Sequence, residues 1–129
     1  MTRQKIIATP SAPSSPLFSQ GVRVGSTVYV SGMVGMDPAT GALAGPSIQE
    51  QTRQALRNCD AVLRAAGASL DDAVMVTVLL AHPEDFDGMN EAYAEVFAND
   101  PPARAVGRLG PELPGILVSI LMTAHADER

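Results

Sequence analysis

The spacing of hydrophobic positions divides the chain into segments that predict strands and segments that predict helices. Short runs of apolar and β-branched residues predict six strands, within residues 5–8, 17–25, 27–32, 73–80, 104–110 and 115–126. Apolar residues at steps of three, four or seven predict one helix after Ser47 and a second within residues 82–100. The predicted order of elements is therefore β-β-β-α-β-α-β-β.

The first predicted helix carries signals at both ends. Ser47 and Glu50 match a capping box, in which a hydroxyl and a carboxylate three residues apart satisfy free backbone N–H groups. Gly67 suits a left-handed turn after the last residue. One apolar stripe connects the two ends, and it consists of Ile48, Ala55, Cys59, Val62 and Ala66.

Two helices are too few to cover both faces of a sheet of five or six strands, so we expect an α/β two-layer sandwich with both helices on one face. Residues 74–80 and 116–122 are apolar at odd and even positions alike, which favours burial of both their faces. An oligomer that covers the open sheet face would provide this burial. The length of 129 residues predicts a single domain over residues 1–129.

Composition narrows the class of partner. The formal net charge of −5 argues against a general nucleic-acid or anionic-membrane surface, but it allows one local site for a small anion. Cys59 is the only cysteine, which excludes an internal disulfide and favours a reducing, cytoplasmic setting. The N-terminus lacks the apolar core of a signal peptide, and the longest apolar run is too short to span a membrane.

Most catalytic patterns are missing from the sequence. His82 and His125 have no Cys, His or Asp partner at ligand spacing, so we expect no metal site. Cys59 lies on the apolar stripe, which favours a buried, inert thiol. Ser31 ends a strand, where its hydroxyl either has a function or is satisfied by nearby backbone.

Arg104 is the best remaining candidate for a functional side chain. A guanidinium is always charged and can hold a carboxylate with two parallel hydrogen bonds. Pro101 and Pro102 stiffen the backbone just before it. A surface arginine that pairs with an acid or caps the second helix is the alternative. Arg108 would lie on the same sheet face in a regular strand, as a second anion contact or as a solvated side chain.

Three segments of the chain, taken together, carry a resemblance to a known family. They are PLFSQGVRVGSTVYVSGMVGMDPATGAL at 16–43, QTRQALRNCDAVLRAAGASLDDAVMVTVLL at 51–80, and FDGMNEAYAEVFANDPPARAVGRLGPELPG at 86–115. In this combination they resemble the Rid (YjgF) family of reactive intermediate deaminases. This resemblance implies a chorismate-mutase-like fold and a homotrimer with sites between subunits. It also implies hydrolysis of enamines and imines of the 2-aminoacrylate type to a 2-keto acid and ammonia, without a cofactor.

The resemblance assigns roles to individual residues. Arg104 matches the arginine that binds the substrate carboxylate, Ser31 and Gly32 match the end of a pocket-lining strand, and Val106 falls where a backbone carbonyl lines the site. Two positions depart from the family pattern. Phe18 stands where a tyrosine is usual, and Leu121 stands where we align a glutamate that helps to position or activate water.

Several functions remain open at this point. The first is a hydrolase similar to a 2-iminobutanoate/2-iminopropanoate deaminase, with Arg104 holding the carboxylate. The second is a non-catalytic trimer that binds a small carboxylate as a sensor or regulator, and a third is a specialised deaminase for a larger imine. The ribonuclease activity attached to endoribonuclease L-PSP-like members is disfavoured, because the chain is acidic and lacks a basic stripe.

Overall fold

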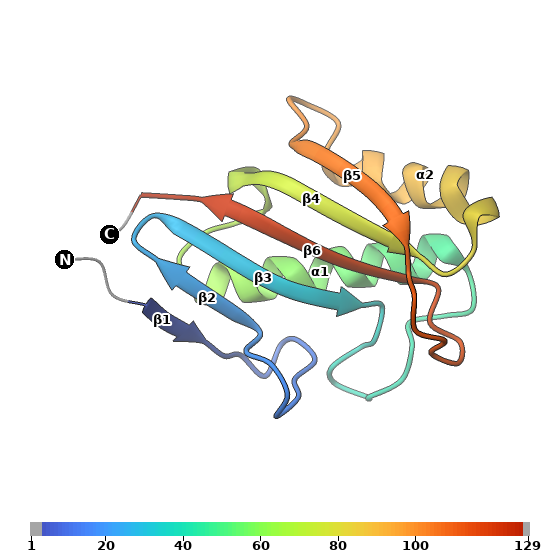
Figure 1. Cartoon of the computed structure of the whole chain (residues 1–129), viewed down its shortest axis with the longest axis horizontal. Helices are drawn as coiled ribbons and strands as arrows, with labels where there is room; N and C mark the ends of the chain where they lie inside the picture. Colours follow the sequence, from blue (N-terminus) through green and yellow to red (C-terminus); the bar gives the residue numbers. More distant parts are fainter. Residues whose placement is uncertain (1–3, 128–129) are drawn as a thin grey trace.

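The computed structural model describes residues 4–127, which form one mixed sheet with two helices. The strands are β1 (Gln4–Ile7), β2 (Gly21–Val24), β3 (Thr27–Val34), β4 (Ala73–Leu80), β5 (Ala103–Arg108) and β6 (Val118–His125). The helices are α1 (Ile48–Ala65) and α2 (Phe86–Val96), with short 3-10 turns at Leu70–Asp72 (η1) and Pro83–Asp85 (η2). This order is the predicted one (Figure 1).

The strands lie in the order β1-β2-β3-β6-β4-β5 (Figure 1). Only β4 and β5 are parallel, and α2 makes the connection between them that parallel neighbours require. Strands β5 and β6 follow each other in sequence but are separated by β4. Strand β5 is therefore an edge strand, connected to β6 by a long loop over residues 109–117.

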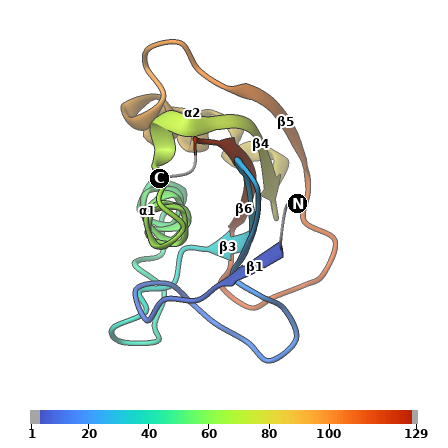
Figure 2. The same cartoon turned by 90° about the vertical axis from the view of Figure 1, so that its left-hand side faces the viewer.

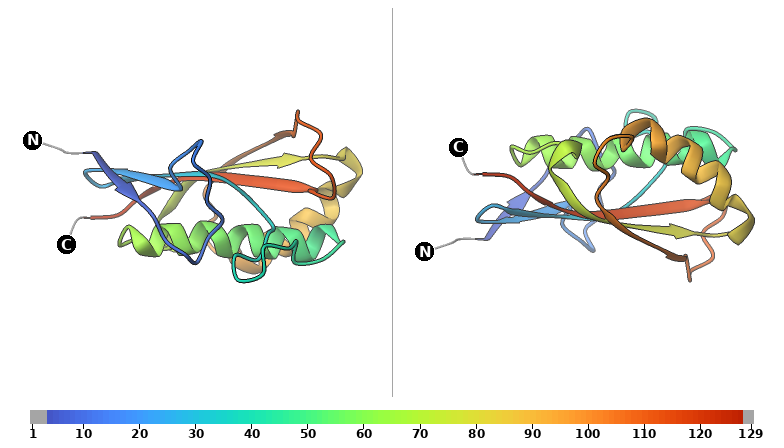
Figure 3. Two further views of the ribbon diagram at one scale, coloured as in Figure 1. Left: turned by 90° about the horizontal axis from the view of Figure 1, so that it is seen from below. Right: turned by 90° about the horizontal axis from the view of Figure 1, so that it is seen from above.

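Both helices pack on the same face of the sheet, as Figures 2 and 3 show, which confirms the predicted two-layer sandwich. The core lies between this face and α1, where Val28, Val76, Val78 and Ile120 are fully buried. The opposite face stays open in the single chain. Large apolar side chains there are more than a third exposed, and Tyr29, Met75 and Leu121 are among them.

Helix α1 forms as its sequence predicts. Ser47 accepts a hydrogen bond from the Glu50 N–H at 3.1 Å, the Glu50 carboxylate bonds back to Ser47, and Gly67 follows the helix with a φ of +85°. All five residues of the predicted apolar stripe are buried. Gly35 follows β3 and lets the chain approach helix α1 closely. Any larger residue would clash there, because a Cβ on Gly35 would lie 2.5 Å from the Gln51 carbonyl oxygen.

Helix α2 differs from its prediction in one respect. The spacing of Phe86, Met89, Tyr93 and Phe97 predicts that these residues face one way, and the last three are buried. Phe86 is 42% exposed, because α2 begins at this residue, directly after η2, and its ring reaches the edge strand β5 instead of the core. No helix in residues 4–127 is long and apolar enough to cross a membrane.

Candidate functional site

Arg104 lies on the helix-covered face of the edge strand. Its Cα is paired with that of Val76, whose side chain is fully buried against the helices, and paired residues of neighbouring strands point to the same face. Arg108 is paired in the same way with Leu80. The prediction that the two arginines share one sheet face is therefore confirmed.

Neutral groups of α2 hold the Arg104 guanidinium. Its Nη1 donates a hydrogen bond to Asn90 Oδ1 at 2.7 Å and contacts Met89 Sδ at 4.0 Å. Its Cζ lies 4.7 Å from the centre of the Tyr93 ring and 5.9 Å from that of Phe86, both within cation–π range. The side chain is thus fixed from one side, with further N–H groups left to bind a ligand.

No carboxylate lies within 4.0 Å of Arg104 among residues 4–127. Arg53 pairs with Glu95 and Arg64 with Asp60, so other arginines of this acidic chain do have acid partners. The charge of Arg104 is supported by an amide and two aromatic rings without being neutralised. An uncompensated, positioned guanidinium is a suitable contact for a small carboxylate.

The Tyr93 hydroxyl beneath Arg104 is buried and has no hydrogen-bond partner among the described residues. Burial raises the pKa of Tyr93, although the positive charge of Arg104 acts in the opposite direction. Tyr93 therefore stays neutral at physiological pH, and its ring serves Arg104 as an aromatic face.

Val106 lies two residues beyond Arg104 on the free edge of the sheet. Leu109 N donates to Leu80 O, so odd-numbered residues of this segment direct their backbone groups towards β4. Because the direction alternates along a strand, the N–H and C=O of Val106 point away from the sheet. The carbonyl is free for a partner beyond the edge.

Ser31 and Gly32 form an irregularity in β3, opposite β6. The pairing register shifts between Val30 and Met33, so two residues occupy the place of one. Ser31 Oγ donates to the Ser19 carbonyl oxygen at 2.5 Å, which satisfies its proton and leaves its lone pairs available. This is the backbone-satisfied alternative for Ser31, and it also ties β3 to the segment that carries Phe18.

Leu121 lies on β6 close to this irregularity. It is 37% exposed on the open face, and Phe18 is 45% exposed. Ser119 lies two residues before Leu121 and so shares its face. A Cβ on Gly32 would lie 2.9 Å from Ser119 Oγ, which places this hydroxyl directly beside Gly32.

The predicted site residues therefore fall into two groups on opposite faces of the sheet. Arg104 and Val106 belong to the edge strand on the helix side, and Ser31, Gly32 and Leu121 belong to the open side. Strands β6 and β4 separate β3 from β5, a lateral distance of ~14 Å at ordinary strand spacing. One small ligand cannot contact both groups within a single chain.

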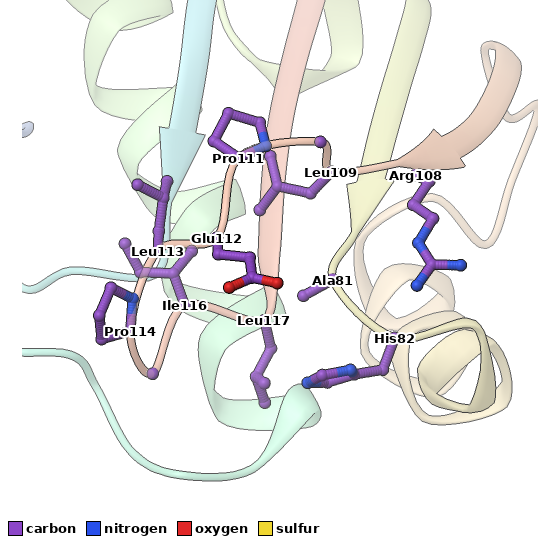
Figure 4. Close-up of a pocket in the computed structure, with 12 residues that line it drawn as sticks. Ala81, His82, Arg108, Leu109, Pro111, Glu112, Leu113, Pro114, Ile116 and Leu117 are labelled. Atoms are coloured by element: carbon purple, nitrogen blue, oxygen red, sulfur yellow. The ribbon is translucent and has the colours of Figure 1, made fainter.

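Two cavities lie near Arg108. One, of about 560 Å³, is bounded by Leu80, Pro83, Phe86, Val106, Gly107 and Arg108. The other, of about 500 Å³, is enclosed mainly by the loop over residues 109–117 and also by His82 and Arg108 (Figure 4). Arg104 lines neither of these two cavities, but it touches the first through Phe86.

The remaining reactive residue types have structural surroundings. Cys59 is fully buried, its thiol contacts the Ile120 carbonyl oxygen at 3.4 Å, and burial raises the pKa of this thiol. His82 lies between β4 and η2, with Nδ1 3.9 Å from Glu84 Oε1. Within residues 4–127 no three His, Cys, Asp or Glu side chains group as metal ligands would.

Sequence reasoning missed the residues that support Arg104. Asn90 carries no signal in the sequence, and the spacing that puts Tyr93 on the apolar face of α2 does not indicate a contact with an arginine. Ser119 was also missed, although its position two residues from Leu121 on one strand could have indicated it. The contacts of Arg104 depend on the parallel pairing of β4 with β5, which the pattern of hydrophobic residues does not specify.

Comparisons with known proteins identify the family of the chain. The family model described as Endoribonuclease L-PSP matches residues 9–126. A RutC family protein of Saccharolobus solfataricus is 42% identical over 95% of this chain and 98% of its own length. The human 2-iminobutanoate/2-iminopropanoate deaminase is 42% identical over 79% of this chain and 75% of its own length.

A solved structure gives the same result for the fold. The structure titled E. coli TdcF with bound serine superposes with a TM-score of 0.88 at 31% identity, over 95% of this chain and 99% of that one. The chain belongs to the Rid (YjgF, endoribonuclease L-PSP) family, and it has the chorismate-mutase-like fold of that family. The predicted family and fold class are thus confirmed.

Proposed function

We propose that the protein hydrolyses small 2-imino acids, and their enamine tautomers, to 2-keto acids and ammonia. The observation that carries this proposal is Arg104, a guanidinium that α2 holds through Asn90 and Tyr93 and that no acid of the described residues neutralises. The human relative is named for this reaction on iminobutanoate and iminopropanoate, and the TdcF structure holds a bound amino acid.

In the proposed reaction Arg104 binds the carboxylate and orients the adjacent C=N bond. A water oxygen adds to the imine carbon, and the imine nitrogen takes up a proton. The resulting carbinolamine loses ammonia as its C–N bond breaks and C=O forms. Imines react with water readily, so holding the two reactants in one orientation is the main contribution required of the protein.

The two faces of the sheet supply different parts of the proposed site. Arg104 and the outward-pointing Val106 carbonyl would come from one subunit, and Ser31 and Gly32 from the open face of another. The strand order supports this division, because it keeps the two groups apart within one chain. A homotrimer that covers the open face with neighbouring subunits would join them and bury the exposed Tyr29 and Met75.

The site offers little acid–base chemistry of its own. The Ser31 proton is committed to the Ser19 carbonyl, and Leu121 cannot transfer a proton. The Ser31 hydroxyl can still accept a hydrogen bond from a water molecule, and the Ser119 hydroxyl can accept or donate one. We therefore expect positioning, with a modest rate acceleration, to outweigh proton transfer by side chains.

A coupled assay tests the proposal. A pyridoxal-phosphate serine dehydratase releases 2-aminoacrylate, and the formation of pyruvate and ammonia is compared with and without the protein. Wild type should accelerate this step over buffer. Arg104→Ala should lose the acceleration, while Arg57→Ala, which changes an exposed arginine of α1, should keep it. Equal rates for wild type, Arg104→Ala and buffer would overturn the proposal.

A second function is favoured by one observation. The apolar Leu121 beside Ser31 and Gly32 suits a trimer that binds a small carboxylate without turning it over. Calorimetry with pyruvate and 2-oxobutanoate separates the two functions. Binding that depends on Arg104, without acceleration in the coupled assay, would assign the sensor role.

A further inference from the structure

The helix-side face of β5 presents two arginines with an apolar residue between them. Arg104, Val106 and Arg108 alternate along the strand and are paired with Val76, Val78 and Leu80 of β4. The partners on β4 are buried, whereas every residue of β5 is exposed. The two arginine Cα atoms lie ~13 Å apart at ordinary strand rise.

An apolar cavity lies beside these three alternating side chains of β5. Its volume is about 560 Å³, and Val106, Phe86 and Arg108 are among its lining residues. The Phe86 ring joins the cavity to Arg104, since Arg104 Cζ lies 5.9 Å from its centre. A ligand whose carboxylate binds Arg104 would therefore extend its side chain over Phe86 and Val106 towards Arg108.

Arg108 is available to an anion at the far end. No carboxylate of the described residues lies within 4.0 Å of it. It also lines the second cavity, together with His82 and Glu112, and Figure 4 shows it extending from the end of β5 towards the segment that carries His82. The formal net charge of −5 repels anions from most of the surface, so two free guanidinium groups beside one cavity define a local exception.

We propose that Arg108 is a second anion contact, and that the preferred substrates are 2-imino acids with a second carboxylate at the end of a short apolar chain. This inference rests on the proposed function, because it places the first carboxylate at Arg104. A chain of five or six carbons would lie on Phe86 and Val106. A monocarboxylic imine of the same length would leave Arg108 unpaired.

The test compares two imines that differ only in the second carboxylate. An amino-acid oxidase generates them in place from 2-aminoadipate and from norleucine, and trapping with semicarbazide reports the imine that survives. Wild type should hydrolyse the imine of aminoadipate with the higher kcat/KM. Arg108→Gln should lower that value about 10- to 100-fold, as expected for a hydrogen bond to a charged group, and should change the norleucine imine less than about twofold.

Three further variants make the outcome specific. Arg108→Lys should retain part of the preference, Arg104→Gln should reduce hydrolysis of both imines, and Arg57→Gln should change neither. An Arg108→Gln variant that treats both imines as wild type does would overturn the inference while leaving the proposed function intact. A wild type without preference for the dicarboxylic imine would do the same.

If wild type accelerates neither imine, the proposed function fails and binding decides the inference by itself. Calorimetry then compares 2-oxoadipate with 2-oxohexanoate. Tighter binding of 2-oxoadipate that is lost in Arg108→Gln supports the second anion contact. Equal affinity for the two ligands, or a preference that survives in Arg108→Gln, overturns it.

Discussion

Gln51 connects helix α1 to the loop over residues 109–117, and its replacement gives a prediction whose size follows from the structure. The side chain is 1% exposed. Its Nε2 donates to the Gly45 carbonyl at 3.0 Å and to the Gly115 carbonyl at 2.9 Å, and its Oε1 accepts from the Leu117 N–H at 2.9 Å. One amide thus connects the start of α1 to two segments, the chain around Gly45 before the helix and the loop over residues 109–117.

Gln51→Met keeps the length of the side chain and removes all three hydrogen bonds. At about 1 kcal/mol for each bond, the free energy of unfolding should fall by ~3 kcal/mol. In urea unfolding followed by far-UV circular dichroism, the midpoint should fall by about 1 M or more, given how steeply the unfolding free energy of small proteins depends on urea concentration. The loop should also become more mobile, with faster amide exchange at Leu117.

The matched control is Gln49→Met on the same helix. Gln49 makes one exposed side-chain hydrogen bond, from its Nε2 to Glu91 Oε2 at 3.2 Å. The free energy of unfolding of the Gln49→Met variant should therefore differ from that of wild type by less than about 0.5 kcal/mol. Equal unfolding midpoints for the two variants would refute the reasoning, since the buried amide would then contribute no more than a surface one.

Two further predictions concern close packing and pH. Gly35→Ala should lower the free energy of unfolding by about 1–3 kcal/mol, because the new Cβ would meet the Gln51 backbone. The control Gly110→Ala, whose Cβ would have no atom within 4 Å, should leave stability unchanged or raise it slightly. Equal thermal midpoints for the two variants would contradict this prediction. Burial raises the pKa of Cys59, so the unfolded chain loses the thiol proton at a lower pH than the folded chain does. The free energy of unfolding should therefore fall as the pH rises above about 8.5. If the dependence of this free energy on pH were the same in Cys59→Ala, Cys59 would not be its cause.

The local elements of this fold could be predicted because their signals are short-range. The capping box at Ser47, the left-handed Gly67 and the apolar stripe of α1 each depend on residues within a few positions of one another, and all are found. The open sheet face also followed from the sequence, since two helices cannot cover six strands on both sides.

The position of Arg104 could not be predicted in the same way. Strand order decides which face and which neighbours it has, and β5 pairs with β4 although β6 follows it in the chain. Its hydrogen bond to Asn90 joins positions 14 residues apart, through a parallel crossover. Hydrophobic spacing identifies the strand but leaves its partner open.

The separation of the candidate site into two faces is the main result of the structure that the sequence did not contain. The family resemblance implies sites between subunits, but it does not say which residues each subunit contributes. The structure places Arg104 on the helix side of the sheet and Ser31 and Gly32 on the open side, with two strands between β3 and β5. A shared pocket then requires a second copy of the chain, which makes the subunit arrangement part of the proposed chemistry.

Complementation between two inactive variants tests this central claim most directly. Arg104→Ala removes the guanidinium, and Gly32→Val fills the open face beside Ser119, where even a Cβ would lie 2.9 Å from the Ser119 hydroxyl. The two variants are co-expressed with different tags, mixed oligomers are purified through both tags, and imine hydrolysis is measured. If each site of a trimer takes Arg104 from one subunit and Gly32 from the next, about one site in three is intact in every mixed trimer and activity returns. Mixed oligomers as inactive as each variant alone would contradict the account.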